Sequence, residues 1–150
     1  MPPEPTPLPF AGIEQVKICS RLCAARCCRY VTVGITPPRS EADWDEVRWW
    51  LLHPGIAVYK DGEDGEWAVC FETRCSNLSA NNLCKAWPNH PDLCREHDAT
   101  VCEFREPTPY EVYLTCEDDL ARYLEKRRLV RGRRVLEAIR RSRAAGTAVP

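Results

Sequence analysis

Residues 72–108 are the part of this sequence that most limits what the chain can fold into. The stretch has little periodic hydrophobicity, yet it holds Cys75, Cys84, Cys94 and Cys102. A loop of this length without secondary structure of its own is uncommon inside a compact domain. Something other than apolar packing must therefore order it, and metal–thiolate bonds would do so.

A second group of cysteines lies near the start of the chain, in the run C-x3-C-x3-C-C at Cys19, Cys23, Cys27 and Cys28. Residues 13–30 lack Gly and Pro and predict a helix. Steps of four residues advance slowly around a helix, so the first three cysteines are expected along one face. The fourth, Cys28, is expected to point about 100° away.

Thiolates are soft ligands that suit zinc and iron–sulfur centres, and four of them complete either kind of shell. Eight cysteines provide two shells of four, or one shell with spare thiols. The predicted metal ligands are Cys19, Cys23, Cys27, Cys28, Cys75, Cys84, Cys94 and Cys102. Two other interpretations are buried apolar thiols and disulfides, although vicinal and i,i+4 cysteines fit disulfide geometry poorly.

The remaining cysteines and the histidines near Cys94 are weaker candidates. Cys70 lies within an expected strand and Cys116 at an expected helix start, so we predict that neither is a ligand. His90 and His97 flank Cys94, and either could complete a Cys3His zinc site.

The rest of the chain predicts an α+β fold: a small cysteine-rich, metal-ordered domain with a β-hairpin, irregular loops and a C-terminal helical extension. Ser40 and Asp43 form a capping-box pattern that opens a helix to about His53. Short strands are expected at 30–36, 56–60 and 66–71, a short helix near Pro91 with Asn89 as its cap, and helix from about 109 to 145 with a break at Gly132. The expected organisation is a Pro-rich leader (1–12), a cysteine-cluster domain (13–108), a helical basic extension (109–145) and a tail (146–150).

The chain is electrically bipolar although its net charge is only −1. Residues 122–143 hold ten Arg and Lys against two Glu, a net charge of +8, so the remainder carries −9. This segment could dock on nucleic acid or an acidic protein. We favour a solvated helix whose arginines pair with the acidic body, because no aromatic residue follows Tyr123 to stack on bases.

Several classes of protein are disfavoured. No apolar run reaches the roughly 18 residues of a membrane span. The start, MPPEPTPLPF, lacks the basic and apolar segments of a secretory signal, so a reducing cytoplasm is expected. The sequence holds no Gly-rich phosphate loop, G-x-S-x-G or H-E-x-x-H pattern, and this favours a non-catalytic protein.

Residues 19–104 resemble the YkgJ-type cysteine-cluster family, which is named for its CxxCxxCC motif. The resemblance is carried by CSRLCAARCCRY, DWDEVRWWLLH, DGEWAV and TRCSNLSANNLCKAWPNHPDLCREHDATVCEF. In the family, a cysteine precedes an aromatic residue and then Arg-Pro-x-x-Cys-Arg. Here Cys84 precedes Trp87, His90 stands in place of the arginine, and Pro91, Cys94 and Arg95 follow; the opening spacings are x3 rather than x2.

The resemblance implies a zinc- or iron-chelating domain. Together with the residues, it predicts a metal-binding protein with an accessory or redox role, and we favour an iron–sulfur cluster over zinc because cysteines dominate. A structural-zinc module that presents the basic helix to nucleic acid or an acidic protein is the alternative. A secreted disulfide scaffold is a third interpretation.

Overall fold

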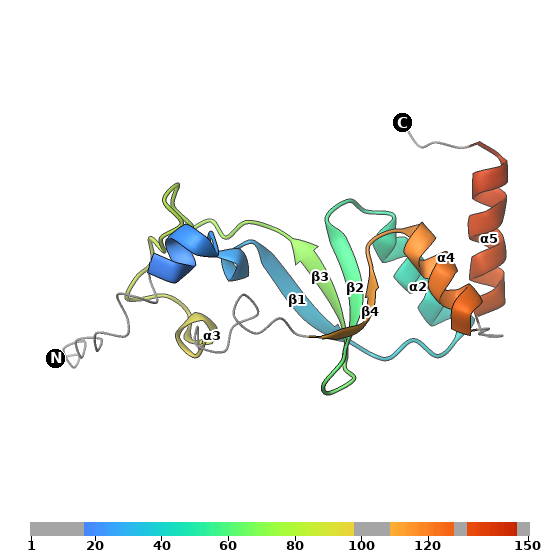
Figure 1. The fold of residues 1–150 in the computed structure, drawn as a ribbon, viewed down its shortest axis with the longest axis horizontal. Coiled ribbons are helices and arrows are strands. Elements are labelled where there is room, and N and C mark those ends of the chain that lie inside the picture. Colours follow the sequence, from blue (N-terminus) through green and yellow to red (C-terminus); the bar gives the residue numbers. More distant parts are fainter. Residues whose placement is uncertain (1–16, 98–108, 128–131, 147–150) are drawn as a thin grey trace. The chain divides into compact units, whose positions relative to one another are not determined.

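The computed structural model describes residues 17–97, 109–127 and 132–146 (Figure 1). Its contacts divide the chain into two compact units, each built from two stretches of sequence. Unit 1 comprises the described parts of residues 1–30 and 73–107, and unit 2 comprises those of 31–72 and 108–150. The expected cysteine domain at 13–108 is thus divided, because residues 31–72 form one unit with the C-terminal segment.

Unit 2 is built on a four-stranded sheet with the order β1-β3-β2-β4. Its strands are β1 (Tyr30–Ile35), β2 (Ile56–Asp61), β3 (Trp67–Glu72) and β4 (Tyr110–Leu114). The central strand β2 pairs antiparallel with both β3 and β4, with Val58 opposite Val69 and Leu114. The predicted hairpin between β2 and β3 is confirmed, and so is the α+β class.

Helix α2 (Glu41–Leu51) begins at the predicted capping box. The Ser40 hydroxyl accepts a hydrogen bond from the Asp43 backbone N–H at 3.2 Å, and the Asp43 carboxylate accepts one from the Ser40 N–H at 2.8 Å. Backbone N–H groups of Arg39 and Ser40 stabilise the charged carboxylate and lower the pKa of Asp43. The helix buries Trp44, Val47 and Leu51, as their spacing predicts.

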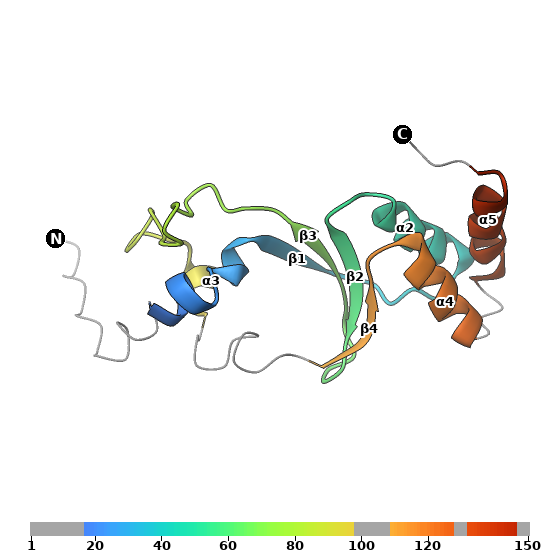
Figure 2. The same ribbon diagram turned by 45° about the horizontal axis from the view of Figure 1, so that its top comes forward.

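Helices α4 (Glu117–Arg127) and α5 (Arg133–Ala144) lie with α2 on the same side of the sheet (Figures 1 and 2). Trp44 is central to this helix layer, with its ring 5.9 Å from that of Trp67 and 5.6 Å from that of Tyr123. None of the helices in the described ranges is long and apolar enough to cross a bilayer. The core consists of Trp44, Val47, Leu51, Val58, Trp67, Val69, Val112, Leu114, Leu120, Ala121, Leu124, Val135 and Ile139.

The structure corrects the expectation of helix from about 109 onward. Residues 110–114 form β4, in which buried Val112 and Leu114 alternate with exposed Tyr113, a period of two that suits a strand. Gly132 does interrupt the helical segment, and α5 begins after it. Because Leu120 and Ile139 are almost fully buried in the core, residues 109–145 are an integral part of unit 2 rather than an extension.

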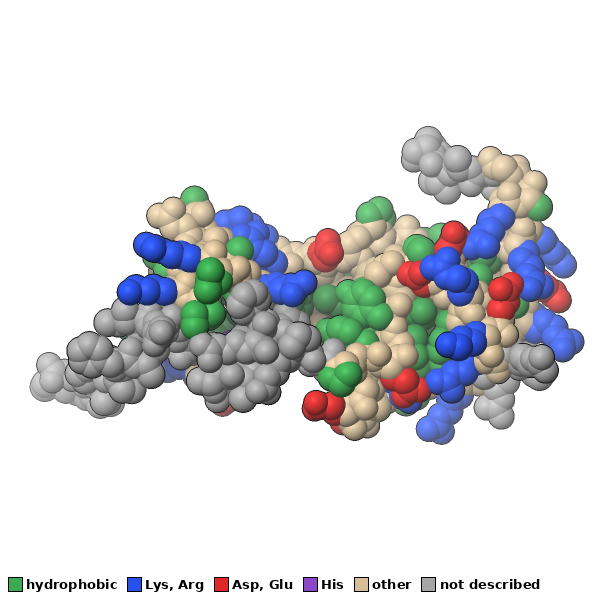
Figure 3. All heavy atoms as spheres, viewed as in Figure 1, with side chains coloured by type: hydrophobic (Ala, Val, Ile, Leu, Met, Phe, Trp, Pro, Cys, Tyr) green, Lys and Arg blue, Asp and Glu red, His purple; other side chains and the backbone are tan. Residues whose placement is uncertain are grey.

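Four arginines of this segment pair with carboxylates, and three of these carboxylates lie outside residues 122–143, as the favoured interpretation of the basic segment predicts. Arg127 lies 2.8 Å from Glu111 and Arg140 lies 2.7 Å from Glu125. Two further pairs are Arg122–Asp119 and Arg143–Asp118. Red carboxylates lie among the blue side chains over α4 and α5 in Figure 3. Arg128 and Arg131 lie outside the described residues.

The substitution Gly62→Ala should destabilise unit 2 by about 1–3 kcal/mol. A methyl group at Gly62 would lie 2.1 Å from the carbonyl oxygen of Pro109, and both belong to backbone that must move to relieve the overlap. Urea unfolding followed by circular dichroism measures the effect. Gly34→Ala is the control, since its methyl group meets nothing within 4 Å. Equal midpoints for the two variants would contradict this account of Gly62.

Candidate metal centre

The first cysteine segment is not the continuous helix that its composition predicts. A π-helical turn, η1 (Ile18–Leu22), is followed by Ala24 and Ala25 at φ 55° and 51°, and then by a 3-10 turn, η2 (Arg26–Cys28). Left-handed residues cannot continue a right-handed helix, and each costs roughly 1–2 kcal/mol when it carries a Cβ. The expected single cysteine face is therefore wrong, because the helical conformation is interrupted between the second and third cysteines.

Hydrogen bonds stabilise the segment around Ala24 and Ala25, between η1 and η2. The Ala25 N–H donates to the Cys19 carbonyl at 2.7 Å, and the Cys28 N–H donates to the Ala25 carbonyl at 3.0 Å. The Arg26 N–H points at the sulfur of Cys23, at 3.4 Å. Backbone donors aimed at sulfur stabilise a thiolate, so this turn can hold charged sulfur as well as shape the chain.

Arg29 and Asn82 tie the cysteine turn to a loop more than fifty residues away in sequence. The Arg29 guanidinium donates to the Ala24 carbonyl at 2.8 Å and to the Asn82 side-chain oxygen at 2.7 Å. The Asn82 amide group in turn donates to the Ser20 carbonyl at 3.0 Å. Sequence reasoning missed both residues, because no local pattern links an arginine to an asparagine so distant in the chain.

Backbone hydrogen bonds also bring the second cysteine segment to the first. The Cys75 N–H donates to the Cys28 carbonyl at 2.8 Å, and the neighbouring Thr73 N–H donates to the Arg29 carbonyl at 3.0 Å. Farther along, Cys84 forms a β-bridge with buried Leu78. A short helix, α3 (Asp92–Arg95), then carries Cys94; its N-cap is Pro91 rather than the expected Asn89.

Thiols of both segments affect the pKa values of the Cys27–Cys28 pair. Burial, and to a smaller extent the thiols of Cys28, Cys19 and Cys23, together raise the pKa of Cys27 to about 12. Burial also raises the pKa of Cys28, to which Cys75, Cys94 and Cys84 add. Seven of the eight predicted ligands thus interact electrostatically around this vicinal pair. The eighth, Cys102, lies outside the described residues.

The thiols of the two segments do not form a coordination shell in this structure. Within residues 17–97, 109–127 and 132–146, no three His, Cys, Asp or Glu side chains form a group that could hold a metal ion. In these ranges, free thiols are carried by Cys23, Cys27, Cys28, Cys75, Cys84, Cys94 and Cys116. Chemically, the arrangement offers soft sulfur donors that must lose protons and approach one another before they can form a shell.

The two other cysteines and the two histidines considered as metal ligands lie in different parts of the fold. Cys70 in β3 and Cys116 before α4 both belong to unit 2. The buried His90 stacks on Trp87, with ring centroids 4.7 Å apart, and its Nδ1 lies 3.1 Å from the Pro88 carbonyl. A carbonyl only accepts, so this nitrogen carries the hydrogen. His97 is exposed.

Comparison with family models, with curated proteins and with solved structures finds no match for this chain. The resemblance to the YkgJ-type family stays a prediction, supported by the cysteine pattern alone.

Proposed function

We propose that unit 1 binds a metal through cysteine thiolates and that the protein has an accessory or redox role rather than a catalytic one. The observation that carries the proposal is that backbone hydrogen bonds join the two distant cysteine segments, with the Cys75 N–H donating to the Cys28 carbonyl at 2.8 Å. Scattered apolar cysteines would have no reason to meet in a segment whose hydrophobic residues are few. The strained turn at Ala24 and Ala25 gives further support, since backbone strain is concentrated at functional sites.

The grouping of the thiols suggests how they divide into shells. The thiols of Cys75, Cys94 and Cys84 contribute to the raised pKa of Cys28, so we assign these four cysteines to one tetrahedral shell, which they would complete once they approach one another. Cys27 interacts with Cys19 and Cys23 of the first segment, and a fourth donor such as Cys102 would complete a second shell. Both shells consist of sulfur alone, which fits an iron–sulfur cluster or a structural zinc ion.

An all-cysteine donor set favours the iron–sulfur alternative, because no histidine is needed to complete it. When bound, such a cluster supplies one-electron chemistry, whereas zinc supplies only structural cross-links. The residues of this chain would hold the ion and direct backbone N–H groups such as that of Arg26 toward sulfur. A cytoplasmic location belongs to the same proposal, because a reducing compartment keeps thiols free for metal.

Anaerobic purification of the full chain, followed by metal analysis, sulfide analysis and a visible spectrum, tests the proposal. Brown protein with labile sulfide would support an iron–sulfur cluster, and colourless protein with stoichiometric zinc would support a structural zinc site. Protein without metal whose cysteines are oxidised in pairs would overturn the proposal and leave the disulfide scaffold.

A partner for the basic segment 122–143 stays a prediction. One observation favours it: Arg133 and Arg134 lie in the first turn of α5, which holds no acidic residue of its own, although the Glu41 carboxylate accepts a hydrogen bond from the Arg134 backbone N–H at 3.4 Å. Both are exposed, so they could contact an anionic surface. Salt-dependent capture of nucleic acid by the full chain, reduced in the variant Arg133→Ala with Arg134→Ala at unchanged metal content, would support this second role.

A further inference from the structure

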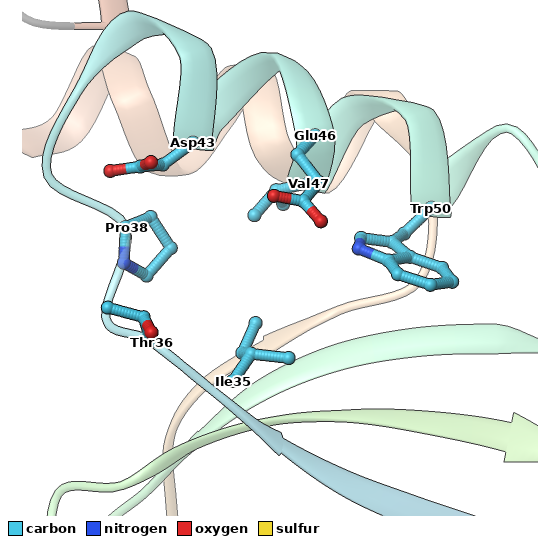
Figure 4. A pocket seen from close by; sticks show the side chains of 7 residues that line it. All are labelled: Ile35, Thr36, Pro38, Asp43, Glu46, Val47 and Trp50. Carbon is cyan, nitrogen blue, oxygen red and sulfur yellow. The ribbon is translucent and has the colours of Figure 1, made fainter.

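A cavity of about 200 Å³ lies between the end of β1 and helix α2. Figure 4 shows Ile35 on the strand side of this cavity and Val47 and Trp50 on the helix side. Pro38, from the segment that joins β1 to α2, lies at one end. All the residues that line the cavity belong to the stretch 31–72 of unit 2, so the cavity is a feature of this unit alone.

The size and the walls of the cavity limit what it can hold. Sites for drug-sized ligands measure roughly 300–1,000 Å³, whereas a water molecule takes roughly 30 Å³. The cavity therefore suits a group the size of an amino-acid side chain rather than a nucleotide. Its aliphatic and indole surfaces favour a ligand with an apolar stem.

The charged groups that line the cavity are acidic. Glu46 lines it from α2, and in Figure 4 its carboxylate points into the same space as the nitrogen of the Trp50 indole. Asp43, one turn earlier, is the second lining carboxylate; backbone N–H groups of Arg39 and Ser40 lower its pKa, so it is charged at neutral pH. Among the described residues, no lysine or arginine lines the cavity, so its charge favours a cation.

The Glu46 carboxylate is open to such a ligand. Arg48, the basic residue of α2, lies 4.0 Å from Asp45 and 2.6 Å from Glu117. In the part of the chain that the structure describes, neither a salt bridge nor a side-chain hydrogen bond engages Glu46. A carboxylate beside an apolar cavity favours a cation that brings its own hydrogen-bond donors, because charge-assisted hydrogen bonds are the strong ones.

We infer that this cavity binds an alkylguanidinium group, with the cation against the Glu46 carboxylate and the Trp50 indole and the stem against Ile35 and Val47. A guanidinium fits better than an ammonium, because it is planar, weakly hydrated and presents N–H groups in pairs to a carboxylate. Indole is also the most favourable aromatic partner of a cation. The group belongs to a free small molecule or to an arginine side chain of a peptide.

Titration of the full chain with butylguanidinium, followed by NMR of its amide and indole N–H groups, tests the inference. We expect shifts concentrated in residues 35–50 and at the indole N–H of Trp50, whose signal Trp50→Phe identifies. Butylurea has a similar shape without the charge and should bind about tenfold more weakly. The blocked tripeptide Gly-Arg-Gly distinguishes the sources, because it should bind more tightly than butylguanidinium if the site takes a peptide, and more weakly if it takes a free small molecule.

Glu46→Gln should weaken the binding of butylguanidinium about tenfold, because the amide keeps the size of the side chain but loses its charge. Glu63→Gln is the matched control: it removes the same charge from the exposed turn between β2 and β3, outside the cavity, and should bind as the wild type does. Circular dichroism verifies that each variant is folded.

Three results would overturn the inference: no shifts in residues 35–50, equal binding of butylurea and butylguanidinium, or unchanged binding in Glu46→Gln. None of them bears on the proposed metal centre, since the cavity lies wholly in unit 2 and the proposed ligands lie in unit 1.

Discussion

Cys28→Ser should release metal from the chain more completely than any substitution in unit 2. The thiol of Cys28 is the one that interacts with all three described cysteines of the second segment. Loss of a supporting residue around a metal site already costs 10–100-fold in affinity, so loss of a ligand should cost more than about 100-fold. Metal analysis after exposure to a chelator of known affinity measures the change.

The same substitution should loosen residues 73–97, because the free energy of metal binding is also folding free energy. Amide hydrogen exchange of this segment should rise, while exchange in α2 and β2 should change little. Cys116→Ser is the matched control, since this exposed thiol lies in unit 2. If Cys28→Ser kept the metal content of the wild type, Cys28 would be excluded from the shell.

Trp44→Ala should cost unit 2 about 3–5 kcal/mol of unfolding free energy. The side chain is 3% exposed and contacts the rings of Trp67 and Tyr123, so its loss leaves a cavity between helix and sheet. Urea unfolding followed by far-ultraviolet circular dichroism is suitable, because it does not depend on the fluorescence of the removed ring.

Trp49→Ala supplies the comparison within the same helix. This tryptophan is 52% exposed and its ring contacts those of Trp50 and His53 at the surface, so its removal should cost less than about 1.5 kcal/mol. Equal destabilisation by the two substitutions would mean that the helix layer is not organised around Trp44.

Local signals explain which elements the sequence predicts well. Ser40 and Asp43 are three residues apart, and their capping box forms without help from the rest of the chain. The hairpin of β2 and β3 is likewise defined by a short turn rich in Gly and Asp. β4 was missed because its partner β2 lies about fifty residues earlier, and a five-residue strand has little pattern of its own.

The candidate site, like the fold, is predictable from the sequence only in part. The spacing of the cysteines predicts the ligand set, because soft donors in two clusters have few other uses. The break at Ala24 and Ala25 is unpredictable from composition, since alanine is the strongest helix former and tertiary contacts override that preference here. The bridge from Arg29 to Asn82 is likewise tertiary, and it becomes visible only once both segments are folded.

The interleaving of the two units has a consequence for the order of folding. Residues 31–72 form a loop inserted between the two halves of the cysteine unit, and β1 and β3, which begin and end it, are neighbours in one sheet. Pairing of these strands brings the ends of the loop together. Burial of the hydrophobic core of unit 2, rather than binding of the ion, then offsets the entropic cost of closing the loop. A metal bound as proposed would then meet two cysteine segments that are already joined, and capture should be faster by the chain with a folded sheet than by an unfolded one.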